Sequence, residues 1–247
     1  MDRTRFFESR RRVLSEEVSE GGIGTLGEKL LHKVLKYYFE PCEEHHEREL
    51  LGSVADVFDG ERVVEIQTRA FNKLLPKLRK FLPHYPVTVV YPIVRVRVLR
   101  WLDRETGELT PPRKSTKRGK YSDALPELSA IRELIPNENL TVKLVYLDSE
   151  EYRYLDGWDK SRKHGATKLQ LIPTDIIAIE ELASRDDYRC LLPEGLPEQF
   201  CAEELYRVLG MRGRRAYFSL NLLRELAIIK QTGTRGRAYI YEINKEV

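Results

Sequence analysis

One short stretch, residues 53–69, constrains the fold of this chain more than any other. It holds two apolar runs rich in β-branched residues with Asp59-Gly60 between them, a pattern that predicts a β-hairpin. Asp56 lies in the first run, and Glu65 and Gln67 lie in or directly after the second. Because side chains alternate along a strand, Glu65 and Gln67 face the same way, and pairing of the two strands can bring Asp56 beside them.

Two carboxylates beside an amide favour a particular chemistry. Carboxylate oxygens suit a hard divalent cation such as Mg²⁺, which commonly binds one or two of them and keeps several waters. Such an ion activates water and stabilises the leaving oxygen of a phosphodiester. The pattern therefore predicts a metal-dependent nuclease. An Asp near a hairpin followed by a Glu in a strand is also common at solvated sheet edges, so the surrounding elements matter.

The surrounding elements come in an informative order. Residues 25–39 show apolar side chains at helical spacing, and residues 71–82 form a second helical pattern that Pro76 should start or kink. A compact apolar strand follows at residues 87–91. The order helix, hairpin, helix, strand allows a crossover to a parallel strand, so we expect an α/β fold.

The first of these helices carries two further polar candidates. Thr25 and Glu28 form a capping-box pattern, so Glu28 is explained as well by capping as by a role in the site. His32 lies one turn after Glu28 on the same side of the helix. His32 could face the site, but we expect it to pack against neighbours or to point to solvent.

Asp56, Glu65 and Gln67, in this order of elements, resemble the PD-(D/E)xK nuclease superfamily, which includes restriction enzymes and Holliday-junction resolvases. The resemblance implies a restriction-endonuclease-like mixed sheet flanked by helices, with Glu28, Asp56, Glu65 and Gln67 as the catalytic residues. It also implies that Mg²⁺ or Mn²⁺ is bound by Asp56, Glu65 and the backbone carbonyl of Ile66.

This chain departs from the superfamily pattern at two positions. Gln67 replaces the usual Lys, as in some restriction enzymes of the superfamily, and Ala55 stands where the family name has Pro. Further runs at residues 24–32, 65–69, 90–93 and 113–119 resemble a poorly characterised family of bacterial proteins. That resemblance implies a fold and a site but no pathway.

The charge distribution predicts a contact with phosphates. The net charge is only +3, yet basic residues concentrate between residues 95 and 120, where a polar loop is suited to gripping a nucleic-acid backbone. A solvated basic loop explains the same residues equally well. The candidate contacts here are Arg113, Lys114, Lys117 and Arg118, and Arg69, which flanks the predicted site, is a further one.

The C-terminal residues predict a small winged helix-turn-helix domain. A helix over residues 200–209 is stopped by Gly210, a second helix spans 214–226, and a hairpin joins 228–232 to 237–243 through a turn at 233–236. Such domains place a helix in the major groove and a wing on phosphates, although they also serve for dimerisation or docking. The candidate DNA contacts are Arg212, Arg214, Arg215, Arg235 and Arg237.

We therefore expect a nuclease-like domain over residues 1–165 and a winged helix-turn-helix domain over 166–247. The predicted function is a Mg²⁺-dependent endodeoxyribonuclease, with DNA as partner, RNA left open, and a homodimer plausible because a double-strand cut needs two sites. The alternative is a DNA-binding regulator whose nuclease fold is an inactive scaffold, or a docking module.

The same sequence predicts a cytoplasmic protein. No apolar run approaches the roughly 18 residues of a membrane span, and the first residues lack the apolar core of a signal peptide. The 3 cysteines are odd in number and widely spaced, which favours free thiols in a reducing compartment.

Overall fold

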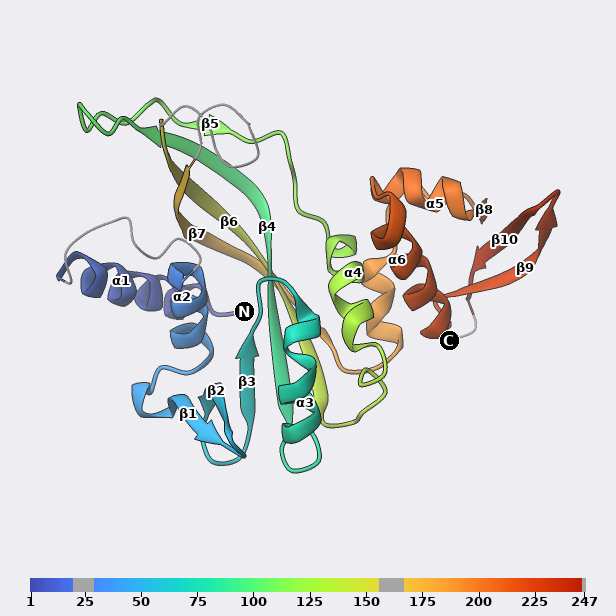
Figure 1. Ribbon diagram of the computed structural model, residues 1–247, viewed down its shortest axis with the longest axis horizontal. Helices are drawn as coiled ribbons and strands as arrows, with labels where there is room; N and C mark the ends of the chain where they lie inside the picture. Colours follow the sequence, from blue (N-terminus) through green and yellow to red (C-terminus); the bar gives the residue numbers. More distant parts are fainter. Residues whose placement is uncertain (20–28, 156–166, 246–247) are drawn as a thin grey trace.

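The computed structural model describes residues 1–19, 29–155 and 167–245 of the 247-residue chain. A large mixed sheet forms its centre, helices lie against the sheet, and a smaller sheet with two helices follows (Figure 1). The helices are α1 (Arg3–Ser19), α2 (Lys29–Phe39), α3 (Leu75–Phe81), α4 (Leu125–Leu128), α5 (Ala202–Leu209) and α6 (Gly213–Glu225). The strands are β1 (His46–Leu50), β2 (Ser53–Phe58), β3 (Val63–Ile66), β4 (Val87–Leu102), β5 (Arg113–Lys114), β6 (Leu140–Tyr154), β7 (Thr167–Leu182), β8 (Gln199–Cys201), β9 (Ile229–Arg235) and β10 (Ala238–Ile243).

The predicted hairpin is present as β2 and β3. The two strands pair antiparallel, with Val57 opposite Val64. At the turn, Asp59 Oδ1 accepts the backbone N–H groups of Glu61 at 3.0 Å and Arg62 at 2.9 Å. Gly60 supplies the left-handed backbone, with φ of 101°. This confirms the hairpin that Asp59-Gly60 predicted.

The crossover from β3 also follows the prediction. The chain leaves β3, passes through α3 and returns as β4, which pairs parallel with β3. The large sheet has the order β1-β2-β3-β4-β6-β7, with β5 on β4; β4 and β6 are parallel, and β6 and β7 are antiparallel. Pro76 lies at the start of α3, where its missing N–H costs nothing. The α/β class and the mixed sheet are therefore confirmed.

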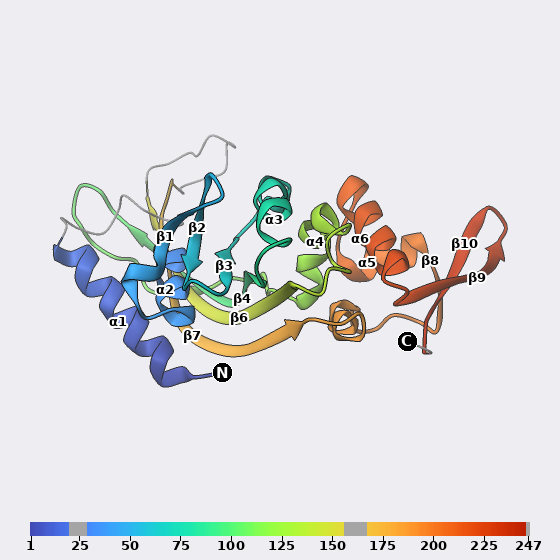
Figure 2. The ribbon, with the colours of Figure 1, turned by 90° about the horizontal axis from the view of Figure 1, so that it is seen from below.

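Alternating side chains of the sheet bury two separate cores. Val63 and Val89 belong to the core that includes α3, α4 and α6, whereas Val64 and Val90 belong to the core that includes α1 and α2. Neighbouring residues of one strand thus serve opposite faces of the sheet. Figure 2 shows α3 and α4 on one side of β4, β6 and β7 and α1 on the other.

The C-terminal elements come in the order strand, two helices, hairpin. α5 begins at Ala202, two residues later than expected, because Phe200 lies in β8, which pairs with β10. Gly210, with φ of 66°, ends α5 as predicted. Gly233 lies inside β9 rather than in the turn, which falls at Gly236 instead. α5 and α6 share one core with the large sheet, so the C-terminal elements are anchored to it.

The expected boundary between residues 165 and 166 falls in the stretch 156–166, outside the described residues. β7, which lies just beyond it, pairs with β6 over most of its length and so belongs to the large sheet. Cys42, Cys190 and Cys201 are free thiols. Within the ranges that the structure covers, no helix is both long enough and apolar enough to cross a membrane.

Candidate functional site

The hairpin brings the two predicted carboxylates to one pocket. Asp56 comes from β2 and Glu65 from β3, and both line a pocket of about 400 Å³ that is open to solvent. Gln67 lines the same pocket, so the three residues of the predicted motif do lie together. The other residues around it are His32, Ile66, Thr68, Arg69, Ala70, Lys73 and Lys77.

Asp56 is held in the ionised form by two neighbours. The Ile66 N–H donates to Asp56 Oδ2 at 2.8 Å, and His32 Nε2 lies 3.1 Å from the same oxygen. Burial opposes ionisation of Asp56, but the hydrogen bonds and the charge of His32 outweigh it, and the pKa of Asp56 is lowered. The expectation that His32 packs or faces solvent is therefore wrong: α2 directs it to this carboxylate.

Glu65 is the buried member of the pair, with 1% of the residue exposed. Lys77 Nζ donates to Glu65 Oε2 at 2.6 Å, whereas Glu65 Oε1 is buried without a hydrogen-bond partner in the described structure. Burial and, after it, the negative charge of Asp56 raise the pKa of Glu65 to about 7, although Lys77 partly offsets this. Glu65 therefore keeps its proton to a higher pH than an exposed glutamate does.

Gln67 does not point its amide group at the carboxylates. Its side-chain nitrogen donates to the backbone carbonyl of Arg69, and its backbone N–H donates to the Val90 carbonyl at 2.9 Å. The cation beside Glu65 comes from Lys77 instead, a residue that the sequence pattern did not single out. The available signal was its position: Lys77 directly follows Pro76 in the first turn of the crossover helix that begins after β3.

Two further members of the predicted metal and catalytic set are Glu28 and the backbone carbonyl of Ile66. Glu28 lies outside the described residues. The backbone of Ile66 faces the β2 side of β3, because its N–H reaches Asp56 while the N–H of Gln67 reaches β4. Since the N–H and C=O of one residue lie on the same edge of a strand, the Ile66 carbonyl is directed to the Asp56 side as well.

The oxygen donors of this pocket are of the type that Mg²⁺ and Mn²⁺ prefer. Among the residues that the structure covers, no three His, Cys, Asp or Glu side chains form a group that could hold a metal ion. A divalent cation would therefore rely on Asp56, Glu65, the Ile66 carbonyl and water. The buried Glu65 Oε1 without a partner fits this use, because an unsatisfied carboxylate oxygen is costly unless something binds it.

The state of Glu65 gives a prediction for stability. With divalent cations removed by EDTA, the wild type should lose stability as the pH rises from about 4.5 to about 7, because the folded protein retains a proton that the unfolded chain releases. Glu65→Gln should remove this loss and be about 1–3 kcal/mol more stable than the wild type at pH 8. Urea unfolding at pH 5 and pH 8 measures this. Glu61→Gln, an exposed change in the same hairpin, is the control; equal pH slopes in Glu65→Gln and the wild type would contradict the prediction.

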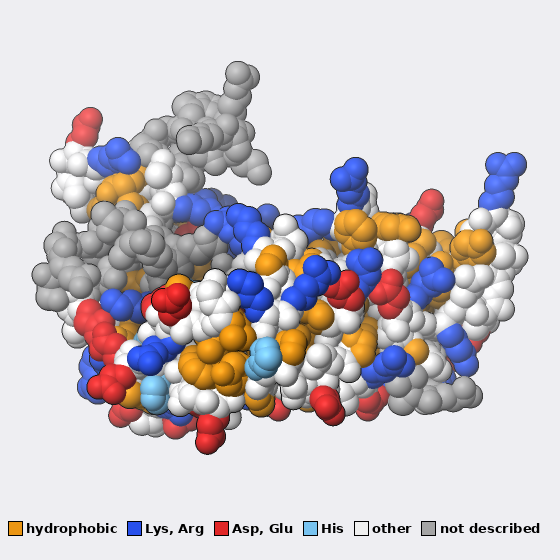
Figure 3. All heavy atoms as spheres, turned by 60° about the horizontal axis from the view of Figure 1, so that its bottom comes forward, with side chains coloured by type: hydrophobic (Ala, Val, Ile, Leu, Met, Phe, Trp, Pro, Cys, Tyr) orange, Lys and Arg blue, Asp and Glu red, His pale blue; other side chains and the backbone are white. Residues whose placement is uncertain are grey.

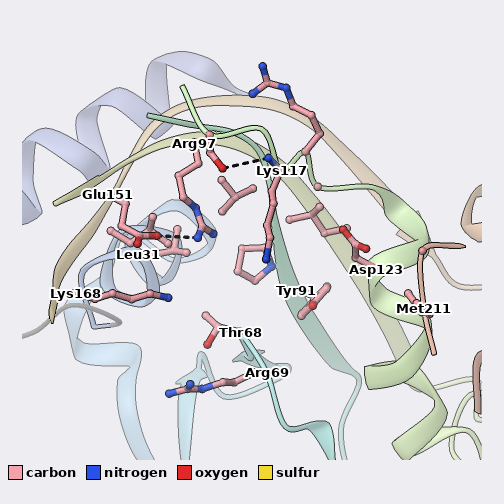
Figure 4. A pocket seen from close by; sticks show the side chains of 18 of the residues that line it. Leu31, Thr68, Arg69, Tyr91, Arg97, Lys117, Asp123, Glu151, Lys168 and Met211 are labelled. Carbon is pink, nitrogen blue, oxygen red and sulfur yellow. Dashed lines mark hydrogen bonds and ion pairs between the residues drawn. The ribbon is translucent and has the colours of Figure 1, made fainter. Parts of the chain in front are cut away.

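A second, larger pocket adjoins the carboxylates. It has a volume of about 890 Å³ and shares Thr68 and Arg69 with the carboxylate pocket. We call it the basic groove. Lys117 and Arg118 of the predicted phosphate-binding loop line it, and so do Arg212 and Arg215 at the beginning of α6. In Figure 4, Lys117 reaches into the groove from above while Thr68 and Arg69 lie at its lower edge.

The loop of Lys117 is fixed to β4. The Ser115 N–H donates to the Arg97 carbonyl at 2.8 Å, the Gly119 N–H donates to the Val94 carbonyl at 3.0 Å, and Tyr146 Oη donates to the Gly119 carbonyl at 2.6 Å. A side chain at Gly119 would meet the Val94 oxygen at 2.4 Å, so only glycine allows the loop to lie this close. The groove wall is therefore built into the fold.

The other predicted basic contacts lie elsewhere on the surface. They are exposed and are not among the residues that line the basic groove. Figure 3 shows Lys and Arg side chains spread across the middle of one face and out to the C-terminal hairpin. The predicted contacts that lie outside the basic groove are Arg113 and Lys114 of β5, Arg214 of α6, and Arg235 and Arg237 of the hairpin β9–β10.

Comparisons with known proteins give relatives but no activity. A family model described as Domain of unknown function (DUF8091) matches residues 29–183, which include the hairpin, the carboxylate pocket and β4 to β7. An uncharacterized protein of Treponema pallidum (strain Nichols) is 33% identical over 221 residues, covering 89% of this chain and 86% of that protein. No solved structure matches this chain.

Proposed function

The chain belongs to this family of domains of unknown function, and we propose from its site that it is a metal-dependent nuclease acting on DNA. One observation carries the proposal. Glu65, which is buried, and Asp56, which is partly buried, come from paired strands and share a pocket. This pocket has Thr68 and Arg69 in common with a groove rich in Lys and Arg. Carboxylate oxygens can bind a cation, and Lys and Arg side chains beside them can bind phosphates. Metal-dependent hydrolysis of a phosphodiester uses both kinds of contact.

Each residue of the pocket has its own role in the proposed reaction. Asp56, Glu65 and the Ile66 carbonyl hold Mg²⁺ or Mn²⁺, which supplies Lewis-acid activation of the phosphodiester when bound. His32 orients Asp56 and keeps it ionised. Lys77 balances the charge of Glu65 and is placed to stabilise the negative charge that develops on the phosphate. Arg69, which borders both pockets, is a candidate contact to the neighbouring phosphate.

We propose further that the C-terminal elements act as a winged helix-turn-helix on DNA. Two helices followed by a hairpin support this, as do the exposed Arg214 at the beginning of α6 and Arg235 and Arg237 at the hairpin. Arg212 and Arg215, also exposed, would contact the part of the DNA that enters the basic groove.

A second function is favoured by one specific contact. Because the Gln67 amide is bonded to the Arg69 carbonyl, the position that carries the usual lysine of the superfamily contributes nothing to the carboxylates. A DNA-binding regulator on an inactive nuclease scaffold would tolerate this. Such a protein should bind duplex DNA without metal and should not cut it.

The deciding experiment is cleavage of circular, linear and branched DNA by the wild type with Mg²⁺ or Mn²⁺. We expect strand cuts that need the cation and stop in EDTA. Circular DNA distinguishes endonuclease from exonuclease action, since only an endonuclease opens it. No cleavage of any of the three substrates, together with metal-independent duplex binding, would replace the nuclease by the regulator.

A further inference from the structure

The basic groove is strongly cationic, and residues from β4, from the loop 115–119 and from the beginning of α6 line it. Seven of its lining residues are Lys or Arg and two are Asp or Glu. One of the acids, Glu151, is already neutralised, because Arg97 bonds it at 2.7 Å and Arg153 Nε donates to it at 2.6 Å. Figure 4 shows the Arg97–Glu151 pair at one side of the groove and Lys168 beside it. The positive charge that remains favours binding of an anionic ligand.

One buried acceptor at the groove, the side-chain oxygen of Gln170, has no hydrogen-bond donor in the described part of the chain. Gln170 lines the groove and is 2% exposed, and its Oε1 is itself buried. A buried acceptor without a partner is costly, so a ligand that donates there would be favoured. A phosphate oxygen has no proton to donate, whereas the edge of a nucleobase has N–H groups. The ligand should therefore combine phosphates with bases.

The size of the groove indicates the form of this nucleic acid. Its volume of about 890 Å³ is within the roughly 300–1,000 Å³ of ligand clefts, enough for a few nucleotides of one strand. One turn of a DNA duplex needs far more space than this groove offers, because the major groove of the duplex is by itself about 12 Å wide. Bases inside a duplex are also paired, and only an unpaired base presents its whole edge to a group such as Gln170.

We propose that the basic groove binds a single strand of nucleic acid and delivers it to Asp56 and Glu65. The phosphates lie along Lys117, Arg118 and Lys168, and a base donates to Gln170. Because Thr68 and Arg69 border both pockets, a strand that leaves the groove passes directly to the carboxylates. This inference rests on the proposed nuclease function and names its substrate: a single-stranded segment such as a flap, a gap or an opened junction.

Binding in EDTA tests this without any cleavage. Fluorescence anisotropy with labelled 20-nucleotide DNA single strands, RNA single strands of the same sequence and the matching DNA duplex should show at least about tenfold tighter binding of single strands than of duplex. Lys117→Glu/Arg118→Glu should weaken single-strand binding at least about tenfold at low salt, because phosphate contacts are electrostatic. Arg185→Glu, an exposed charge reversal outside the groove, should change it less than about twofold. The RNA arm shows whether one sugar is preferred.

A neutral variant tests the groove if the double charge reversal does not fold. Gln170→Met removes the acceptor with little change in volume, and it should bind a normal strand and an abasic strand equally, whereas the wild type should prefer the normal strand. Equal affinity of the wild type for single strand and duplex, or unchanged single-strand binding in the charge-reversed protein, overturns the proposal. Groove-dependent single-strand binding without any cleavage would support the groove as the single-strand site but overturn the nuclease and the delivery of the strand to Asp56 and Glu65. Metal-dependent cleavage with duplex bound more tightly than single strand would support the nuclease and overturn the single-strand groove.

Discussion

Asp56→Asn is expected to lower the rate of metal-dependent DNA cleavage by about a thousandfold, with little change in the fold. Asparagine has nearly the same shape and still accepts the Ile66 N–H, which reaches Asp56 at 2.8 Å, but it carries no charge for a cation. Lewis-acid stabilisation of the reacting phosphate amounts to several kcal/mol, and about 4 kcal/mol corresponds to a factor of a thousand. Single-turnover cleavage with Mn²⁺ measures this loss.

The control for this variant lies in the same hairpin. Asp59 accepts N–H groups of the turn, as asparagine does equally well, and it does not line the carboxylate pocket. Asp59→Asn should therefore cut within about twofold of the wild type. Mn²⁺ should raise the melting temperature of the wild type and of Asp59→Asn but not of Asp56→Asn. An Asp56→Asn protein that cuts within tenfold of the wild type would rule out Asp56 as a metal ligand of the nuclease.

The hairpin and the crossover could be predicted because local rules determine them. Asp59-Gly60 sets a tight turn between β-branched runs, and the parallel pair β3–β4 needs a connection of the length that α3 provides. The convergence of Asp56 and Glu65 follows from strand alternation together with the antiparallel pairing of β2 and β3. In the C-terminal segment, Gly210 was readable as a helix end for the same reason: a left-handed residue favours glycine.

The parts that could not be predicted depend on tertiary geometry. Nothing in the spacing of residues 25–39 shows that α2 points His32 at Asp56 rather than at solvent, because that depends on how α2 crosses β3. The cation beside Glu65 was sought at position 67, where the superfamily places it, and not on α3. The pairing of Phe200 with Tyr241 across β8 and β10 involves residues far apart in the chain, so the local helical pattern at 200–209 concealed it.

Arg212 and Arg215 illustrate the same limit at the level of function. Their place at the beginning of a second helix predicted contacts in a major groove of DNA. In the folded protein both line the basic groove together with Lys117, which is almost a hundred residues earlier in the chain. Their charge was predictable, but which surface they share depends on how α6 packs against α4, and that contact is formed by the common core.

Lys77→Met is expected to slow metal-dependent cleavage by about a hundredfold. The variant removes the cation that lies 2.6 Å from Glu65 and that faces the pocket where the phosphate would react, and losing one such electrostatic contact typically costs a factor of about 100 to 1,000. Because Lys77 lowers the pKa of Glu65, its removal should also move the acid limb of the pH–rate profile to higher pH. A purely structural role of Lys77 would not move that limb.

Two further variants make this test specific. Lys80→Met, an exposed change one turn along α3 where the side chain bonds Ser53 Oγ at 2.9 Å, should cut as fast as the wild type. In the Lys77→Met background, Gln67→Lys returns a lysine to the position that the superfamily uses. This position directly follows β3 and lines the same pocket, so the change should restore cleavage about tenfold. If Lys77→Met cuts normally, the cation beside Glu65 has no part in the reaction. If Lys77→Met is slow and Gln67→Lys restores it, the charge in this pocket matters more than the chain position that supplies it.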